Sequence, residues 1–297
     1  MKIVLAGCTG FIGRRLVQHL VERGHDCTVL IRSSASSGPG IFPETVRLAP
    51  YKDMPDEAEA VVNLAGESVA GLWTTNKKVR IIRSRVETTE KLVKWMEGLS
   101  KRPSIFVSGS ATGIYGDRGD ERLSEKSNPD PENRFLAQVC KPWEAAANKA
   151  REFGVRVVTL RTGNVLDPAG GMIGKMLPMF RISPFVVPFA KDAFLPGISM
   201  RDEVGCICYA IENDWVEGPV NLVSPTQSTS GELQSALAEK LNRPVIGSIP
   251  NWALRLVTGE FSEALLASQR VLPEKMQNAG YVFEDPDLGE YLKGLNL

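Results

Sequence analysis

Three glycines near the start of the chain have the spacing that dinucleotide chemistry requires. Gly7, Gly10 and Gly13 follow an apolar run at residues 3–6 that predicts a buried strand, and they open an amphipathic helix predicted over residues 11–23. Such glycines let backbone N–H groups approach a pyrophosphate, and the helix N-terminus adds partial positive charge. Because strand, turn and helix occur in the order that this motif needs, we interpret the stretch as a nucleotide-binding turn. An ordinary tight turn between a strand and a helix is the alternative.

The end of the second predicted strand, residues 27–31, decides which dinucleotide such a site prefers. An acidic residue there holds the 2′-hydroxyl of NAD, whereas an arginine accommodates the 2′-phosphate of NADP. Here the strand is followed by Arg32, by serines and by a small polar loop over residues 33–40 that contains no Asp or Glu. This pattern favours NADP(H), and Arg14 on the first helix could add a second cation. A solvated charge at the strand end is the alternative for Arg32.

These groups need a frame that gathers them at one sheet edge, and the chain has the pattern for it. Apolar runs predict strands at residues 3–6, 27–31, 60–65, 104–108 and 155–160, with a shorter candidate at 46–49. Helices are predicted over residues 75–98 and 135–153. Strands that alternate with helices indicate a parallel, doubly wound α/β sheet of the Rossmann type. We therefore expect residues 1–166 to form an NADP(H)-binding domain.

The rest of the chain, residues 167–297, predicts a smaller C-terminal α+β region on the substrate side, with later segments returning to the sheet. Its predicted helices cover residues 171–181, 202–212, 230–241 and 250–269, and its predicted strands cover residues 220–223 and 245–249.

Composition excludes several other classes of protein. The 297 residues are 43% hydrophobic, and 35 basic residues balance 35 acidic ones, so no basic surface favours nucleic acid or an anionic membrane. No apolar run is long enough to span a membrane, and the glycines and arginines after Met1 argue against a signal peptide. Five scattered cysteines and two histidines argue against zinc, disulfides and a Ser-His-Asp triad, so we expect no metal site. A reducing cytoplasm is the expected location.

Eight ordered stretches resemble one known family. The chain resembles extended and atypical short-chain dehydrogenase/reductases over its full length and, more narrowly, YfcH-like "epimerase family" proteins, which are often labelled nucleoside-diphosphate-sugar epimerases. The resemblance implies the fold of that family and an NADP(H)-type site. The matching stretches are Gly7-Cys-Thr-Gly-Phe-Ile-Gly13, Asn63-Leu-Ala-Gly-Glu67, Ser84-Arg85, Ser108-Gly-Ser-Ala-Thr-Gly-Ile-Tyr-Gly116, Leu160-Arg-Thr-Gly-Asn-Val-Leu166, Gly171-Met-Ile-Gly-Lys-Met-Leu-Pro178, Asn221-Leu-Val-Ser-Pro225 and Gln269-Arg-Val-Leu-Pro273.

The glycine turn, the strand ends and the resemblance together give a set of expected cofactor-binding residues. Gly66 follows the strand at residues 60–65 and has no side chain to obstruct a ribose. Arg85 lies on the charged face of the helix at residues 75–98, and a solvated surface charge is its alternative. The complete set is Gly7, Thr9, Gly10, Phe11, Ile12, Gly13, Ile31, Arg32, Leu64, Ala65, Gly66, Arg85 and Asn164.

Three catalytic candidates also follow from the resemblance. In the superfamily a Ser or Thr hydrogen-bonds the reacting oxygen, a Tyr transfers the proton, and a Lys four residues later holds the ribose and lowers the Tyr pKa. The resemblance places Ser110 at the Ser position and Lys141 at the Lys position. Ala137 stands where the Tyr should be, so Tyr115 is the phenol that could substitute. A turn serine, a phenol packed in its loop and a surface lysine are the alternatives.

The sequence defines the substrate side less well. Relatives carry Trp-Ile-His-Ile-Asp-Asp where this chain has Gly197-Ile-Ser-Met-Arg-Asp202, so the substrates can differ. Glu67, Trp73 and Arg201 are the candidate substrate contacts. Two functions stay open: an NADP(H)-dependent oxidoreductase or epimerase of a small polar or sugar-like substrate, or a catalytically silent NADP(H)-binding sensor or partner-binding protein, which the missing Tyr favours. A monomer and a homodimer are both compatible with the sequence.

Overall fold

A parallel seven-stranded sheet forms the centre of the computed structural model, which describes residues 1–32 and 40–297. Its order is β11-β7-β5-β4-β1-β2-β3, so the chain runs outward from β1 in both directions. Ligands of such sheets bind at this reversal, outside the carboxyl ends of the strands. The bounds are β1 Lys2–Ala6, β2 Asp26–Ile31, β3 Arg47–Pro50, β4 Ala60–Asn63, β5 Ile105–Ala111, β7 Arg156–Thr162 and β11 Gly218–Leu222.

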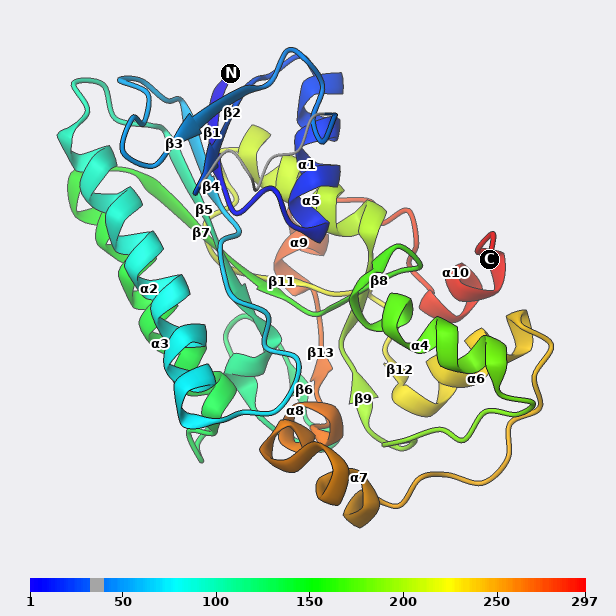
Figure 1. The fold of residues 1–297 in the computed structure, drawn as a ribbon. Helices are drawn as coiled ribbons and strands as arrows, with labels where there is room; N and C mark the ends of the chain where they lie inside the picture. The colour runs from blue at the N-terminus through cyan, green and yellow to red at the C-terminus, as the bar shows by residue number, and fades with distance from the viewer. Residues whose placement is uncertain (33–39) are drawn as a thin grey trace.

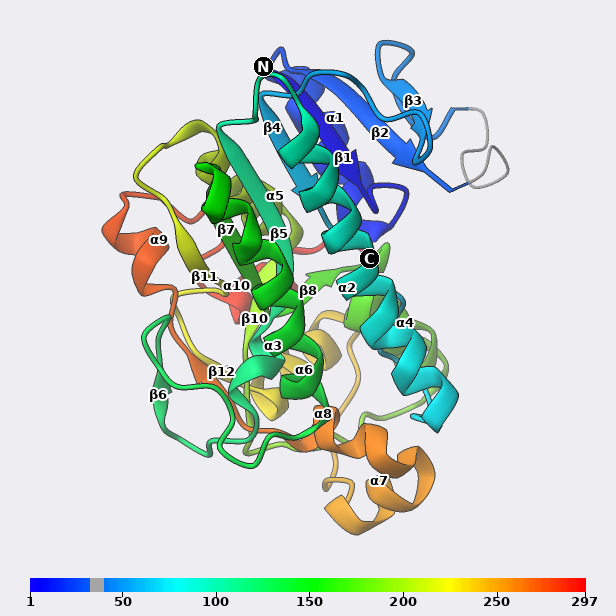
Figure 2. The same cartoon turned by 90° about the vertical axis from the view of Figure 1, so that its left-hand side faces the viewer.

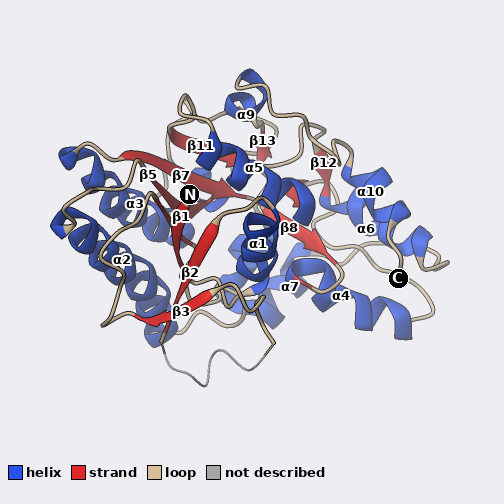
Figure 3. Ribbon diagram, turned by 90° about the horizontal axis from the view of Figure 1, so that it is seen from above, coloured by secondary structure: helices blue, strands red, loops and turns tan. Residues whose placement is uncertain are grey.

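Helices cover both faces of this sheet (Figure 1, Figure 3). One face carries α2 (Thr75–Gly98) and α3 (Phe135–Asn148), which Figure 2 shows side by side, and the other carries α1 (Phe11–Glu22) and α5 (Met200–Glu212). Successive side chains of β1 therefore enter two separate cores, one on each face. A strand buried on both faces needs the nearly continuous apolar run that the sequence has there.

A smaller lobe extends from the carboxyl end of β7 and lies at the lower right of Figure 1. In the described part of the chain, six short strands pair outside the main sheet in three two-stranded sheets, β8 with β10, β9 with β12 and β6 with β13. The remaining helices are those of the lobe and α9, which packs beside β11. The bounds of these elements are β6 Arg122–Leu123, β8 Asn164–Asp167, α4 Gly171–Ile182, β9 Phe194–Leu195, β10 Gly197–Ser199, β12 Ser228–Thr229, α6 Ser230–Lys240, α7 Asn251–Thr258, α8 Ser262–Leu266, β13 Arg270–Val271, α9 Glu274–Asn278 and α10 Leu288–Gly294. Ile173, Leu237 and Leu292 join α4, α6 and α10 in a core of their own.

The start of α5 illustrates how local sequence sets these elements. The Ser199 hydroxyl accepts a hydrogen bond from the Asp202 amide at 3.1 Å, which caps the helix. Two acidic residues, Asp202 and Glu203, then occupy the first turn, where the helix dipole favours negative charge. The cap therefore fixes where α5 starts, and with it the position of Glu203 in the first turn.

The Rossmann-type sheet predicted from the sequence is confirmed, and β11 returns to it beside β7. The predicted strand at residues 245–249 is wrong. Only isolated bridges form there, Val245 with Val186 and Ile249 with Phe189, because Gly247 turns the chain at φ +60°. The predicted loop at residues 33–40 lies outside the described residues except for Gly40. Within residues 1–32 and 40–297, no helix has the length and apolar character to cross a membrane.

Candidate nucleotide-binding and catalytic site

The glycine turn between β1 and α1 is crowded on one side and open on the other. Gly7 has φ +76°, and a Cβ built there would lie 2.3 Å from the Ala65 amide nitrogen. A Cβ at Gly13 would lie 2.3 Å from Cys8 Cα, whereas the one contact of a Cβ at Gly10 within the described part of the chain would be the Gly7 carbonyl oxygen, at 3.3 Å. Gly7 and Gly13 thus permit the tight turn and close helix packing, while Gly10 leaves its backbone accessible to a ligand.

The first turn of α1 faces this open space. The helix begins at Phe11 with Gly10 as its N-cap, and its first turn contains no acidic side chain. The first N–H groups of a helix have no partner within it, and the helix dipole adds partial positive charge there. A hollow of about 920 Å³ beside the turn is lined by Thr9, Gly10, Phe11 and Arg14, among others. An anionic group such as a pyrophosphate matches the chemistry of this helix end.

Three strand ends converge on the same turn. Ala6 at the end of β1 is in register with Leu30 of β2 and Asn63 of β4. The residues that follow these strands therefore flank the glycine turn on both sides. They include Arg32, Leu64 and Ala65 of the predicted cofactor set, and Ile31 of that set is the last residue of β2.

Two predicted cations border this region. Arg32 is exposed directly after β2, and the serines behind it lie outside the described residues. On the first helix, Arg14 Nε donates a hydrogen bond of 2.7 Å to the Thr9 carbonyl oxygen. Arg14 therefore hydrogen-bonds to the glycine turn itself, and Arg32 stands directly after β2, as the sequence predicted.

Arg85 lies against the backbone that follows β4. Its Nη1 donates to the carbonyl oxygens of Glu67 at 2.9 Å and Ile81 at 3.0 Å, and its guanidinium carbon is 5.0 Å from the centre of the Trp143 ring. A Cβ at Gly66 would lie 2.9 Å from the guanidinium carbon. Burial lowers the pKa of Arg85. The absence of a side chain at Gly66 is thus what lets this cation approach the segment predicted to meet a ribose.

Ser110 at the end of β5 begins a chain of hydrogen bonds. Its Oγ donates to Oε1 of Glu144 on α3 at 2.7 Å, and Arg161 of β7 holds both oxygens of the same carboxylate. Nη1 of Arg161 donates to the Tyr115 hydroxyl at 2.9 Å, and that hydroxyl lies 2.7 Å from Oδ1 of Asn221 on β11. The chain therefore links β5, α3, β7 and β11 beneath the carboxyl edge of the sheet.

The structure does not bring Tyr115 to Ser110 directly. Tyr115 is fully buried, and its hydroxyl reaches Ser110 only through Arg161 and Glu144. Burial raises the pKa of Tyr115, so the phenol stays neutral. Burial would lower the pKa of Arg161, but its hydrogen bonds to Glu144 raise that pKa above its ordinary value. The phenol therefore packs its loop and supports the hydrogen-bond chain.

Lys141 is likewise not brought to Ser110. Its Nζ donates to Oδ1 of Asn133, in the loop before α3, at 2.9 Å. The preceding residue, Cys140, faces β5, with its Sγ 3.7 Å from the Ala111 carbonyl oxygen. Burial raises the pKa of Cys140 to about 12, so it remains a thiol. A one-residue step along a helix turns a side chain by about 100°, which separates these two neighbours.

Two predicted substrate contacts are engaged within the protein. Glu67 binds Lys77 at 2.8 Å and Arg80 at 3.2 Å, and the hydrogen bond from Lys77 lowers the pKa of Glu67. Trp73 is buried, and its ring packs edge-on against Phe135 with the ring centres 4.7 Å apart. Trp73 thus belongs to a hydrophobic cluster between α2 and α3.

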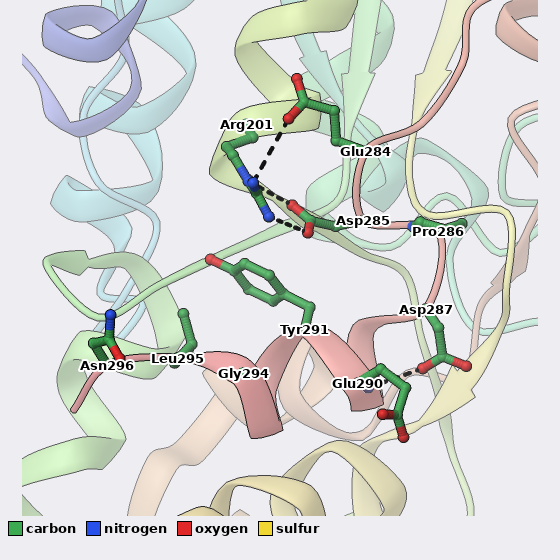
Figure 4. A pocket seen from close by; sticks show the side chains of 10 residues that line it. All are labelled: Arg201, Glu284, Asp285, Pro286, Asp287, Glu290, Tyr291, Gly294, Leu295 and Asn296. Carbon is green, nitrogen blue, oxygen red and sulfur yellow. Dashed lines mark hydrogen bonds and ion pairs between the residues drawn. The ribbon is translucent and has the colours of Figure 1, made fainter.

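The third predicted contact, Arg201, lies in a separate hollow of about 610 Å³ beside α10 (Figure 4). Its Nε donates to Asp285 at 3.0 Å, and the guanidinium also pairs with Glu284 at 3.6 Å. Figure 4 shows the Tyr291 ring next to this ion pair, and the Tyr291 hydroxyl donates to the Leu166 carbonyl oxygen at 2.9 Å. None of the predicted catalytic residues lines this hollow.

Asn164 stands in the junction between β7 and β8, residues 162–164. Its amide donates to the Pro196 carbonyl oxygen at 2.6 Å, and a Cβ at Gly163 would lie 2.4 Å from that oxygen. On the other side of the junction, the Thr162 hydroxyl donates to Oε1 of Glu203 at 2.9 Å. The junction is therefore held by two hydrogen bonds, one to the Pro196 carbonyl oxygen and one to the Glu203 carboxyl group.

A known protein family matches the part of the chain that contains the glycine turn. Residues 3–182, more than half of the chain, match the NAD dependent epimerase/dehydratase family. The chain belongs to that family. Residues 249–295 also match a domain of unknown function, DUF1731. The resemblance predicted from the sequence is thereby confirmed.

Several relatives of this family member align along almost its whole length. Epimerase family protein Mb2239 of Mycobacterium bovis is 33% identical over 98% of this chain and 96% of its own. The crystal structure of human epimerase family protein SDR39U1 (isoform2) with NADPH is 30% identical, has a TM-score of 0.87, and is covered over 98% of its length. A UDP-galactose 4-epimerase structure, 21% identical with a TM-score of 0.75, shares the fold.

Sequence reasoning missed three buried charged residues near the predicted site residues, Glu144, Arg161 and Glu203, which hydrogen-bond to Ser110, Tyr115 and Thr162. Arg161 carried a usable signal, because a charged residue inside a strand of buried apolar residues requires a buried partner. Nothing in the sequence identified that partner as Glu144. Glu203 sits among helical residues of mixed polarity, and only packing shows that it is fully buried.

Proposed function

We propose that this protein binds NADP(H) and acts as an oxidoreductase or epimerase on a small polar or sugar-like substrate. The glycine turn at residues 7–13 carries the proposal, because its open backbone at Gly10 and the free amides of α1 suit a pyrophosphate. Arg32 at the end of β2 favours a 2′-phosphate. The presence of NADPH in the human relative's structure supports the same cofactor.

The predicted cofactor set would hold the dinucleotide across the sheet edge, from Arg32 to Asn164. When bound, the nicotinamide supplies or accepts a hydride. Arg85 would neutralise negative charge beside the ribose, and Ser110 would orient the reacting oxygen. Because the Ser110 proton is directed at Glu144, the Ser110 oxygen presents lone pairs to a substrate hydroxyl.

Glu144 offers a destination for the proton that the missing Tyr would otherwise take. In alcohol oxidation, the substrate O–H bond breaks and its proton passes to Ser110 Oγ, while the Ser110 proton passes to Glu144 Oε1. A hydride would pass from the carbon that bears this oxygen to the bound oxidised nicotinamide, so the substrate would become a carbonyl compound. Reduction reverses each transfer. Ser110 Oγ and Glu144 Oε1 are 2.7 Å apart, within reach of direct proton transfer.

Two measurements test this function. Fluorescence titration of NADPH and NADH should give tighter binding of NADPH, and equal affinities would contradict the role of Arg32. Incubation with nucleotide-sugars and carbonyl compounds plus NADPH, followed by absorbance, should show turnover that Ser110→Ala reduces by about 100-fold or more. Full turnover in Ser110→Ala, with Arg122→Ala at an exposed position of β6 as the control, would remove Ser110 from the reaction.

A catalytically silent NADP(H)-binding protein is the second candidate. Two observations favour it: Ala137 has no transferable proton, and Lys141 binds Asn133 instead of facing Ser110. Tight NADPH binding without turnover of any substrate in the panel, in wild type and Ser110→Ala alike, would support this candidate. A cofactor-dependent change in protease sensitivity would then support a sensor.

We further propose that residues 1–166 supply the cofactor side and residues 167–297 the substrate side, with β11 completing the sheet. A cytoplasmic location is supported by the five cysteines, all of which are buried thiols. Partial proteolysis with and without NADPH tests the division, because the cofactor should protect the first segment more than the second.

A further inference from the structure

Glu203 is a buried carboxyl group that the proposed chemistry does not use. It lies on the first turn of α5, and none of its surface is exposed. Its Oε1 accepts one hydrogen bond, from the Thr162 hydroxyl at 2.9 Å, while its Oε2 has no hydrogen-bond partner among the described residues. Burial raises the pKa of Glu203 to about 8. The group is therefore mostly neutral at physiological pH.

The titratable neighbours of Glu203 do not compensate its charge. Asp202, on the same helix, is directed to the amides of Glu284 and Asp285 in the C-terminal segment. Cys206, one turn further along α5, is a buried thiol whose pKa is raised by burial and by the nearby glutamate. Tyr281 donates its hydroxyl to Asp202. From the sheet, the hydrogen bond to Glu203 comes from the neutral hydroxyl of Thr162 on β7.

The hydrogen bond between Glu203 and Thr162 connects this buried carboxyl group to the predicted cofactor site. Thr162 ends β7 and begins the junction of residues 162–164, which carries Asn164 of the predicted cofactor set. The Pro196 carbonyl oxygen accepts a hydrogen bond from the Asn164 amide and leaves no room for a side chain at Gly163, so the backbone has little freedom there. The hydrogen bond from the Thr162 hydroxyl to Glu203 is the second contact that fixes the junction.

We propose that neutral Glu203 is a positioning residue for the NADP(H) site, and that its ionisation releases the junction and weakens cofactor binding. A buried carboxylate with one donor is strongly destabilised, so the ionised group must move toward water or admit water around it. Either change disturbs Thr162 and therefore Asn164. This inference rests on the proposed NADP(H) binding.

Linkage gives the inference a distinctive signature. If ionisation of Glu203 weakens cofactor binding, then cofactor binding must favour the protonated form of Glu203 by the same factor. NADPH binding should therefore take up protons near pH 8, where the free protein is partly ionised. A residue that only filled space would produce no such proton uptake.

The experiment uses the full chain and NADPH as the probe. Titration calorimetry in two buffers of different ionisation enthalpy measures affinity and proton uptake together. We expect the wild-type Kd to rise about fivefold or more between about pH 7 and about pH 9, with proton uptake. Glu203→Gln, which keeps an acceptor for Thr162 and cannot ionise, should show neither effect. Glu212→Gln, at the far end of the same helix, is the matched control and should behave as wild type.

Hydrogen exchange of the free protein tests the junction without any cofactor. Protection of the amides in residues 162–167 should fall as pH rises through about 8 in wild type, beyond the intrinsic rate increase, and should persist in Glu203→Gln. Identical protection and identical pH profiles in the two proteins would overturn the inference. Absence of NADPH binding at every pH, with the exchange difference present, would instead refute the proposed function and leave Glu203 as the group that fixes the junction.

Discussion

Arg161 and Glu144 form a two-point ion pair between β7 and α3, with Nε 2.9 Å from Oε1 and Nη2 3.0 Å from Oε2. The two side chains are only 8% and 13% exposed. The same carboxylate accepts the hydroxyl proton of Ser110 on the neighbouring strand. The orientation of Ser110 is therefore set by an arginine that does not touch it.

Loss of this arginine should be costly. Arg161→Met leaves the mostly buried Glu144 carboxylate without its partner, so the free energy of unfolding measured in urea should fall by about 3 kcal/mol. Arg23→Met, which breaks a more exposed pair with Glu212, is the matched control and should cost less than about 1 kcal/mol. Equal losses in the two variants would show that the Arg161 pair is no stronger than a surface pair.

The glycine turn permits a comparison between two glycines of similar backbone angle. Gly7 has φ +76° and Gly24 has φ +80°, but no atom of residues 1–32 and 40–297 lies within 4 Å of a Cβ built at Gly24. Gly24→Ala should cost only the left-handed backbone, about 1–2 kcal/mol. Gly7→Ala should cost at least about 2 kcal/mol more, because its Cβ meets the Ala65 backbone. Thermal and urea unfolding of both variants measure the difference.

The stability of the protein should depend on Glu203 in alkaline solution. Its pKa in the folded state, about 8, lies above its ordinary value of 4.5, so its contribution is fully present below the ordinary value and is lost as pH rises through about 8. Glu203→Gln should match wild type within about 1 kcal/mol near pH 5 and exceed it by up to about 4 kcal/mol near pH 9. Parallel stability curves across this range would refute the raised pKa.

Cofactor preference should depend on Arg32. Arg32→Ala removes the cation at the end of β2, so the Kd for NADPH should rise about tenfold or more while the Kd for NADH changes less than about twofold. Arg122→Ala, which removes an exposed arginine from β6, should change neither. A parallel loss of both affinities would point to a general effect on the fold instead of recognition of the 2′-phosphate.

Lys141 should be dispensable for cofactor binding. Its Nζ is bound to Asn133, so Lys141→Ala should leave the Kd for NADPH within about twofold of wild type. Arg85→Ala removes the cation that contacts the backbone after β4, and it should weaken binding about tenfold. The reverse result would return Lys141 to the ribose-holding role that the resemblance assigned to it.

Much of the first half was predictable, because parallel strands buried on both faces must be apolar throughout. We could therefore recognise the strand at residues 3–6, the three glycines and the helix at residues 75–98 from the local sequence alone. Residues 245–249 contain three large apolar side chains, yet the chain turns at Gly247 and no strand forms there. An apolar segment can form a strand, but whether it does depends on the backbone segments that lie beside it in the fold.

The sequence by itself determined the Rossmann-type sheet, the nucleotide-binding turn and the family resemblance, because each depends on short-range spacing. Only the tertiary structure decided which side chains meet. It directed Lys141 to Asn133, enclosed Tyr115, and joined Glu144 to Ser110 across 34 residues of chain and to Arg161 across 17. It also placed Glu203 beneath Thr162. Burial and long-range pairing control protonation and orientation, and neither is encoded in the spacing of neighbouring residues.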